Sequence, residues 1–172
     1  ERLLGPAGMG YEVAEETLLV ARVYLAAACL GGMKRCMQLM TRFAARRKVS
    51  SGTLIDSPIT LAAIGDGLMR IDALQAMLDS QLAVLDRGEY PSDAATIALK
   101  ILASEWIWEI ADSLAQIMGA RGYMEHNIAP MILRDVRMLR VGEGPNELLT
   151  LSLGRRMRAE DGLRAELRRL GA

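Results

Sequence analysis

The stretch YEVAEETLLVARVYLAAACLGGMKRCMQLMTRFAARRK, residues 11–48, decides the fold of this chain. It holds no proline and is rich in alanine, leucine and methionine, which are among the best helix-forming residues. The pattern predicts one long helix from Tyr11 to Lys48. The glycine pair Gly31-Gly32 is expected to weaken or bend this helix near its middle, because paired glycines are a common cause of kinks.

A second helix is predicted on the C-terminal side of this stretch. Between the two, residues 49–58 gather serines, a glycine and Pro58, and should form a connection. Apolar side chains then recur at spacings of three and four, as on one face of a helix. They are Leu61, Ile64, Leu68, Ile71, Leu74, Leu78, Leu82 and Leu85. Gly88 and Pro91 should end the helix, as a C-terminal cap and a breaker.

A third helix is expected from residue 94 to 118, with Ser92 or Asp93 as its N-cap. Shorter helical segments follow at residues 129–139 and 145–170. No segment shows the alternating pattern of a strand. We therefore predict an all-α fold, an up-and-down four-helix-type bundle.

Composition argues against several classes of function. A chain of 172 residues with 51% hydrophobic content can bury one core, so a single compact domain is expected. Twenty-one basic residues balance 21 acidic ones, and this lack of net charge argues against a nucleic-acid partner. The longest uncharged run, residues 23–33, falls short of the roughly 18 to 20 apolar residues that a membrane span needs.

Cysteine and histidine usage narrows the chemistry further. Cys29 and Cys36 lie in the first predicted helix and are separated by about 10 Å of helical rise, which is beyond disulfide reach. Free thiols and the lack of a secretory signal pattern suit the cytoplasm, or the mitochondrial matrix in a eukaryote. His126 is the only histidine and lies in a predicted surface loop, so neither a metal site nor a serine-histidine triad is expected.

The stretch VGEGPNELL breaks the helical pattern around one carboxylate, Glu143, which Gly142 and Gly144 flank. An irregular backbone here would present Glu143 to an apolar cavity, where it would act as a general base near neutral pH. Alternatively, the glycines end one helix and Pro145 opens the next, with Glu147 in its first turn. From the spacing alone, this second interpretation is favoured.

Four segments follow one another in a recognisable order. They are ERLLGPAGMGYEVAEETLLVAR at residues 1–22, RRKVSSGTLIDSPI at 46–59, QIMGARGY at 116–123 and LRDVRMLRVGEGPNELL at 133–149. Together they resemble the C-terminal helical domain of the acyl-CoA dehydrogenases, flavoenzymes that introduce an α,β double bond into acyl thioesters. In that family the first segment leaves a middle β domain, the second reaches the flavin of a neighbouring subunit, the third contacts FAD and the fourth carries the catalytic glutamate.

The resemblance implies roles for particular residues. Glu143 is expected to take the α proton, with Arg22 as a supporting residue beside it. The implied FAD contacts are Arg47, Gln116, Gly119 and Gly122. The implied partners are an acyl thioester in the form of acyl-CoA, an electron-transfer flavoprotein or similar acceptor, and further copies of the chain in a dimer or tetramer. Residues 1–10 would be the linker from the β domain and residues 11–172 the C-terminal bundle, which is expected to be inactive alone.

The chain also departs from the family pattern, and two alternatives stay open. Ser50-Ser51 stands where Phe-Gly is usual, Ala120 replaces a glycine and Pro145 replaces a threonine, so contacts with FAD should differ. One alternative is a noncatalytic helical oligomerisation module, for which some of the eleven methionines would supply the interface and not only core filler. The other is a flavin monooxygenase or oxidase on the same scaffold, which would not need a base such as Glu143.

Overall fold

The computed structural model describes residues 3–50, 52–158 and 160–171. The first two residues of the predicted linker, and Ser51 of the predicted connection, lie outside this part. The elements in chain order are α1 (Gly10–Arg46), β1 (Lys48–Val49), β2 (Gly52–Thr53), η1 (Leu54–Asp56), α2 (Pro58–Asp86), α3 (Asp93–Met118), α4 (Ala120–Tyr123), α5 (Ile128–Arg137), η2 (Met138–Arg140), α6 (Asn146–Arg155), η3 (Arg156–Arg158) and α7 (Glu160–Arg169).

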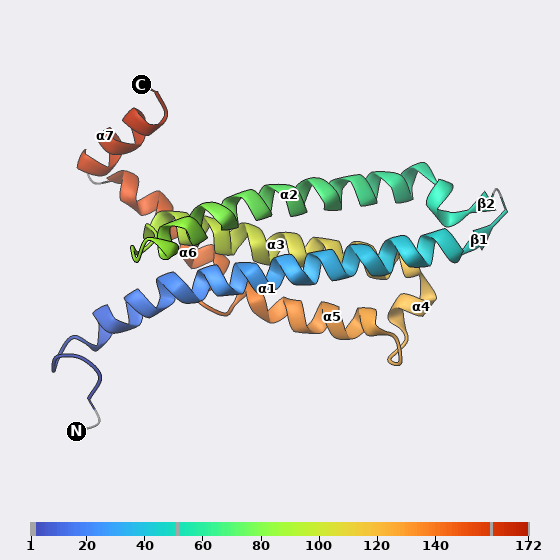
Figure 1. Ribbon diagram of the computed structural model, residues 1–172, viewed down its shortest axis with the longest axis horizontal. Coiled ribbons are helices and arrows are strands. Elements are labelled where there is room, and N and C mark those ends of the chain that lie inside the picture. The colour runs from blue at the N-terminus through green and yellow to red at the C-terminus, as the bar shows by residue number, and fades with distance from the viewer. Residues whose placement is uncertain (1–2, 51, 159, 172) are drawn as a thin grey trace.

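Four helices run up and down beside one another, which confirms the predicted all-α bundle. Figure 1 shows α1, α2 and α3 side by side, with α2 running opposite to the other two and α5 returning along the bundle. The helices α1 and α3 share the most extensive contact, and α5 packs on α3. Within the described residues, no helix is long and apolar enough to cross a membrane.

The helix α1 runs unbroken through Gly31 and Gly32, so the expected weak point does not interrupt it. Gly32 instead allows a close approach between helices. A Cβ atom placed on Gly32 would stand 3.1 Å from Cδ1 of Ile107 on α3. The glycine therefore serves helix packing, which a sequence pattern along one helix does not reveal.

The core lies where α1, α2 and α3 meet, and it is filled partly by methionine. Met33, Met37 and Met40 of α1 are buried there, and Cys29 and Cys36 are buried as free thiols. The predicted apolar face of α2 is only partly covered. Its buried members are Ile71, Leu74 and Leu78, whereas Leu61 and Leu68 are 53% and 51% exposed. Thr60 and Gly67 in the same stretch are buried, so Leu61 and Leu68 lie on a side of α2 that its described neighbours leave uncovered.

Several predicted boundaries need correction. The connection after α1 contains a small antiparallel hairpin, in which Lys48 pairs with Thr53, so the chain is not wholly free of strands. Asp56 stabilises this hairpin, since its Oδ2 accepts hydrogen bonds from the Thr53 backbone N at 2.9 Å and from the Thr53 hydroxyl at 2.8 Å. The segment predicted as one helix at residues 145–170 is divided into α6, η3 and α7. The predicted N-cap is confirmed, because Ser92 Oγ accepts from Ala95 N at 3.2 Å.

Candidate active site

The turn that carries Glu143 connects η2 to α6 and has an unusual backbone. Glu143 has a φ of 56°, and it is the one non-glycine residue with positive φ in the part of the chain that the structure describes. Gly144 follows with a φ of 102°. A left-handed backbone costs an ordinary residue about 1–2 kcal/mol, and it persists only where surrounding contacts enforce it. The second interpretation is confirmed for the helix, because α6 begins directly after Pro145, with Glu147 in its first turn. The role of Glu143 as a base stays a prediction.

Two cations on different helices hold the turn from either side. Arg22 of α1 is buried, and its Nε donates to the carbonyl oxygen of Glu143 at 3.5 Å. Lys100 of α3 is fully buried, and its Nζ donates to the carbonyl oxygen of Gly144 at 2.7 Å. Arg22 also forms an ion pair with Asp93 at 2.7 Å. The predicted pairing of Arg22 with the Glu143 segment is therefore present, through the backbone of the turn.

Asn146, the first residue of α6, joins the turn to α3. Its Oδ1 accepts from Lys100 Nζ at 2.7 Å, and its Nδ2 donates to Glu105 Oε1 at 2.7 Å and to Ser104 Oγ at 2.9 Å. Arg140 Nε, on the other side of the turn, donates to the same Glu105 oxygen at 2.9 Å. The residues on both sides of Glu143 are thus tied to one face of α3.

Sequence reasoning missed Lys100, Ser104 and Asn146, although a signal for two of them was present. Lys100 and Ser104 precede Ile107 on the buried face of α3, at the same helical spacing as the apolar residues that follow. A lysine in the register of an apolar stripe is uncommon, because a charged group is seldom buried without polar partners. Burial lowers the pKa of Lys100, and the charge of Arg22 acts in the same direction, whereas Cys29, Glu105 and Glu143 act against them.

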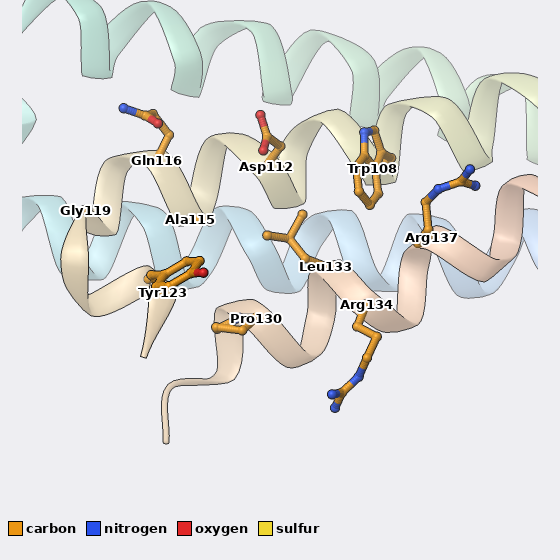
Figure 2. A pocket seen from close by; sticks show the side chains of 11 residues that line it. Trp108, Asp112, Ala115, Gln116, Gly119, Tyr123, Pro130, Leu133, Arg134 and Arg137 are labelled. Carbon is orange, nitrogen blue, oxygen red and sulfur yellow. The ribbon is translucent and has the colours of Figure 1, made fainter. Parts of the chain in front are cut away.

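A separate groove of about 620 Å³ lies between α3, α4 and α5. Figure 2 shows Trp108, Asp112 and Gln116 along α3, facing Leu133 and Arg137 on α5. Three of the four predicted flavin contacts, Gln116, Gly119 and Gly122, line this groove. The guanidinium carbon of Arg137 stands 6.0 Å from the centre of the Trp108 ring, within the range of a cation–π contact.

The two glycines of the groove have clear structural reasons. Gly119 ends α3 with a φ of 59°, a conformation that residues with a side chain rarely adopt. Gly122 lets α4 fold back on α3, because a Cβ atom there would stand 2.5 Å from the carbonyl oxygen of Ala115. These glycines therefore shape the wall of the groove.

Arg47 does not line the groove. It caps the C-terminus of α1, is exposed, and accepts a hydrogen bond from Leu54 N at its carbonyl oxygen at 2.8 Å. Figure 1 shows the adjacent hairpin at the same end of the bundle as α4. Glu143 lies elsewhere, since Lys100 and Gln116 are about 24 Å apart along α3 at 1.5 Å per residue. The predicted site residues thus fall into two places, with Glu143 and Arg22 in one and the groove residues in the other.

A second cavity, of about 500 Å³, lies next to two residues that contact the Glu143 turn. Arg22 and Leu149 line it, and Leu149 also packs against Gly144, where an added Cβ atom would stand 3.2 Å from Leu149 Cδ2. Leu19 and Ile97 supply apolar wall, and Glu12 and Glu15 lie at the α1 side. The lining of this cavity is therefore partly apolar and partly acidic, with Arg22 and Asp93 among its charged members.

Comparison with known proteins gives a consistent picture. Residues 8–158 match the family model for the acyl-CoA dehydrogenase C-terminal domain. The chain is 33% identical over 155 residues to the very long-chain specific acyl-CoA dehydrogenase of Bos taurus, across 88% of this chain and 23% of that protein. It is 26% identical over 160 residues to isobutyryl-CoA dehydrogenase of Dictyostelium discoideum, across 92% of this chain and 38% of that one.

The solved structures agree on the fold. Butyryl-CoA dehydrogenase from Megasphaera elsdenii superposes with a TM-score of 0.84 at 23% identity, across 91% of this chain and 40% of that one. In each of these three comparisons, the chain spans well under half of the protein that it matches.

Proposed function

The chain belongs to the acyl-CoA dehydrogenase family, as its C-terminal domain, and on this premise we propose that it supplies the base that takes the α proton of an acyl thioester. The substrate class is an acyl-CoA, and the relatives named above act on acyl groups as different as very long chains and isobutyryl. The electron acceptor in this proposal is an electron-transfer flavoprotein or a similar carrier. The location is the cytoplasm or, in a eukaryote, the mitochondrial matrix.

The observation that carries the proposal is the state of the Glu143 side chain. Arg22 and Lys100 both bind the backbone of the turn and not its carboxylate. Within the described residues, no hydrogen bond or ion pair engages the Glu143 carboxylate, although the side chain is half-buried. A carboxylate that is held firmly by its backbone, and has its oxygens free, can accept a proton from a substrate placed against it.

The cavity beside the turn suits the acyl part of the substrate. Its apolar wall of Leu19, Ile97 and Leu149 would exclude water from the α carbon while Glu143 takes the proton. Arg22 lines this cavity and also donates to the backbone carbonyl oxygen of Glu143, so it connects the cavity to the turn. The base and the acyl site would thus share one arginine.

The groove between α3 and α5 has a lining that fits FAD. Gln116 offers an amide, Arg137 a cation for phosphate, and Trp108 and Tyr123 aromatic surface, while the glycines allow close approach of a ligand to the backbone. When bound, FAD supplies the acceptor for the hydride that leaves the β carbon. We place FAD contacts at Gln116, Gly119 and Gly122, and at Arg47 nearby.

The distance between the Glu143 turn and the groove has a consequence for oligomer assembly. Gln116 in the groove is about 24 Å along α3 from Lys100, which bonds to the Glu143 turn. Arg47 adjoins the hairpin, which Figure 1 shows at the same end of the bundle as α4. We therefore propose that Glu143 serves one flavin, whereas the groove and Arg47 contact the flavin of a neighbouring copy in a dimer or tetramer. The exposed apolar side chains of α2, which include Leu61, Leu68 and Met69, support self-association.

The decisive experiment replaces Glu143 with glutamine in the full-length enzyme that contains this chain. Glutamine keeps the size of the side chain and removes its ability to take a proton. Anaerobic stopped-flow bleaching of the flavin by an accepted acyl-CoA should slow by about 10² to 10⁴-fold, while binding persists. Glu147→Gln, an exposed carboxylate in α6, is the matched control and should leave the rate unchanged. A Glu143→Gln rate within about threefold of wild type would reject Glu143 as the base.

A further inference from the structure

Lys100 is a fully buried lysine, and its burial is costly for folding. Its side chain has no exposed surface, and its Nζ has two acceptors, Gly144 O and Asn146 Oδ1, each at 2.7 Å. No carboxylate pairs with it directly in the described part of the chain, since Glu105 bonds to Asn146 and Arg140 instead. Burying an ammonium group without a counter-ion is unfavourable, and an apolar residue would fill the same space at lower cost.

We propose that Lys100 is a positioning residue for Glu143. It holds the carbonyl group of Gly144, directly after the base. This contact keeps the left-handed backbone at Glu143 and directs its carboxylate at the substrate. This inference rests on the proposed role of Glu143. Through Lys100, α3 would affect catalysis without touching the substrate or the flavin.

The geometry around the turn makes Lys100 its stronger anchor. The carbonyl oxygens of Glu143 and Gly144 are consecutive along the chain, and each accepts from a cation on a different helix. The bond from Arg22 is long, at 3.5 Å, and Arg22 is shared with the half-exposed Asp93. The bond from Lys100 is 0.8 Å shorter (3.5 minus 2.7 Å) and lies in the interior. Without Lys100, the left-handed backbone at Glu143 would relax to a less strained conformation, and the carboxylate would move.

Lys100 also places a positive charge beneath the base. Lys100 interacts electrostatically with Glu143, and the other charged or titratable groups around it are Arg22 and Cys29 on α1, Glu105 on α3 and Arg140 in η2. Replacing Lys100 therefore removes a charge as well as a hydrogen-bond donor from beside the turn.

The test uses Lys100→Met in the full-length enzyme, with Lys34→Met as the control for loss of a lysine charge. Lys34 is exposed on α1 and donates a hydrogen bond to Gln75 of α2. Flavin reduction is followed anaerobically with the acyl-CoA that bleaches the wild type fastest. Lys100→Met should lower the limiting rate by about 10²-fold, the effect of a small misplacement of a catalytic group, with the acyl-CoA dissociation constant within about threefold.

The outcomes separate this inference from the role of Glu143. If Glu143→Gln keeps its rate, the base assignment fails, and Lys100 is left with a structural role. If Glu143→Gln is inactive while Lys100→Met keeps both its limiting rate and its acyl-CoA dissociation constant, the positioning role alone is overturned. Lys100→Gln, which retains a hydrogen-bond donor, decides by the same two measurements if Lys100→Met does not fold. Failure of both variants to fold would also overturn the inference, because Lys100 would then be required for the fold itself.

Discussion

The Glu143 turn and the groove between α3 and α5 both lie against α3, yet they are built in opposite ways. At the turn, every buried polar group around Lys100 has a partner, and a strained backbone is fixed from two helices. At the groove, the guanidinium of Arg137 lies over an aromatic ring at an exposed surface. The difference teaches that the polar groups around Lys100 are satisfied within one chain, whereas the groove has charged side chains at an open surface.

The largest effect on stability is expected when the hydrogen bonds of the Asn146 side chain are removed. Asn146→Leu removes one acceptor of Lys100 and the donor to Glu105 while keeping the volume. It should lower the free energy of unfolding by about 3 kcal/mol, because charged groups are left buried with fewer partners. Urea unfolding at one fixed protein concentration measures this.

A double variant sharpens the same prediction. Adding Lys100→Met to Asn146→Leu removes the charge that the first change leaves short of a partner. The two changes should therefore be less destabilising together than their sum, by about 0.5–3 kcal/mol. If the two losses in free energy of unfolding were additive, Lys100 and Asn146 would not depend on each other for stability.

The next largest effect is predicted at the wall of the groove. Gly122→Ala forces a Cβ atom against the carbonyl oxygen of Ala115, which belongs to a helix and cannot move aside cheaply. The expected loss in free energy of unfolding is about 1–3 kcal/mol. Gly65→Ala on α2 is the control, since nothing lies within 4 Å of its added Cβ, and it should stabilise the helix by about 1 kcal/mol. A harmless Gly122→Ala would show that the groove wall is adaptable.

Alkaline pH should weaken the core near the turn. Burial raises the pKa of Cys29 to about 12 and that of Cys36 to about 11, from 9.0. Above the unfolded value of 9.0 the unfolded chain therefore holds fewer protons than the folded one, and stability falls as pH rises toward 11 or 12. Each thiol should contribute a loss of up to about 1.4 kcal/mol per pH unit. Lys100, whose pKa is lowered, acts in the opposite direction.

Urea unfolding between about pH 8 and pH 10 measures this effect, with the double variant Cys29→Ala/Cys36→Ala as reference. The slope of stability against pH should be shallower in the reference than in the wild type. Equal slopes would mean that the buried thiols do not control the alkaline limit.

The smallest effect on folding is predicted at Arg137. Arg137→Gln removes a cation–π contact at an exposed site and should change the free energy of unfolding by at most about 1 kcal/mol. In the full-length enzyme the same change should weaken FAD binding by about tenfold, because a charge-assisted contact with phosphate is worth more than a neutral one. Unchanged FAD retention would argue against the groove as a flavin site and leave the turn unaffected.

Part of this molecule could be predicted from sequence because the relevant signals are local. Ser92 and Gly119 mark the ends of α3 through their own hydrogen bonding and backbone preferences, and both predictions are confirmed. The exposure of Leu61 and Leu68 could not be predicted, because an apolar period shows which face of a helix is hydrophobic but not how far along that face a neighbour extends.

The candidate site divides in the same way. Glu143 stood out by its flanking glycines, and its left-handed backbone agrees with that signal. The groove could not be predicted, since Trp108 and Arg137 meet only because α5 folds back along α3. Lys100 was within reach of prediction, because its position in the apolar stripe of α3 was visible in the sequence. The roles of Glu143, Arg47, Gln116, Gly119 and Gly122 stay predictions.

The contact between Gly32 and Ile107 has a consequence for how α1 and α3 can move. These helices carry the two cations that hold the turn, Arg22 on one and Lys100 on the other. An axial slip of α1 by one helical turn, about 5.4 Å, would carry Arg22 out of reach of the Glu143 carbonyl. The Ile107 side chain seated over Gly32 opposes such a slip, because Ala28 and Cys36, one turn before and after Gly32, have side chains where Gly32 has none. The aim of the carboxylate is therefore governed by the relative register of two helices, far from the loop that bears it.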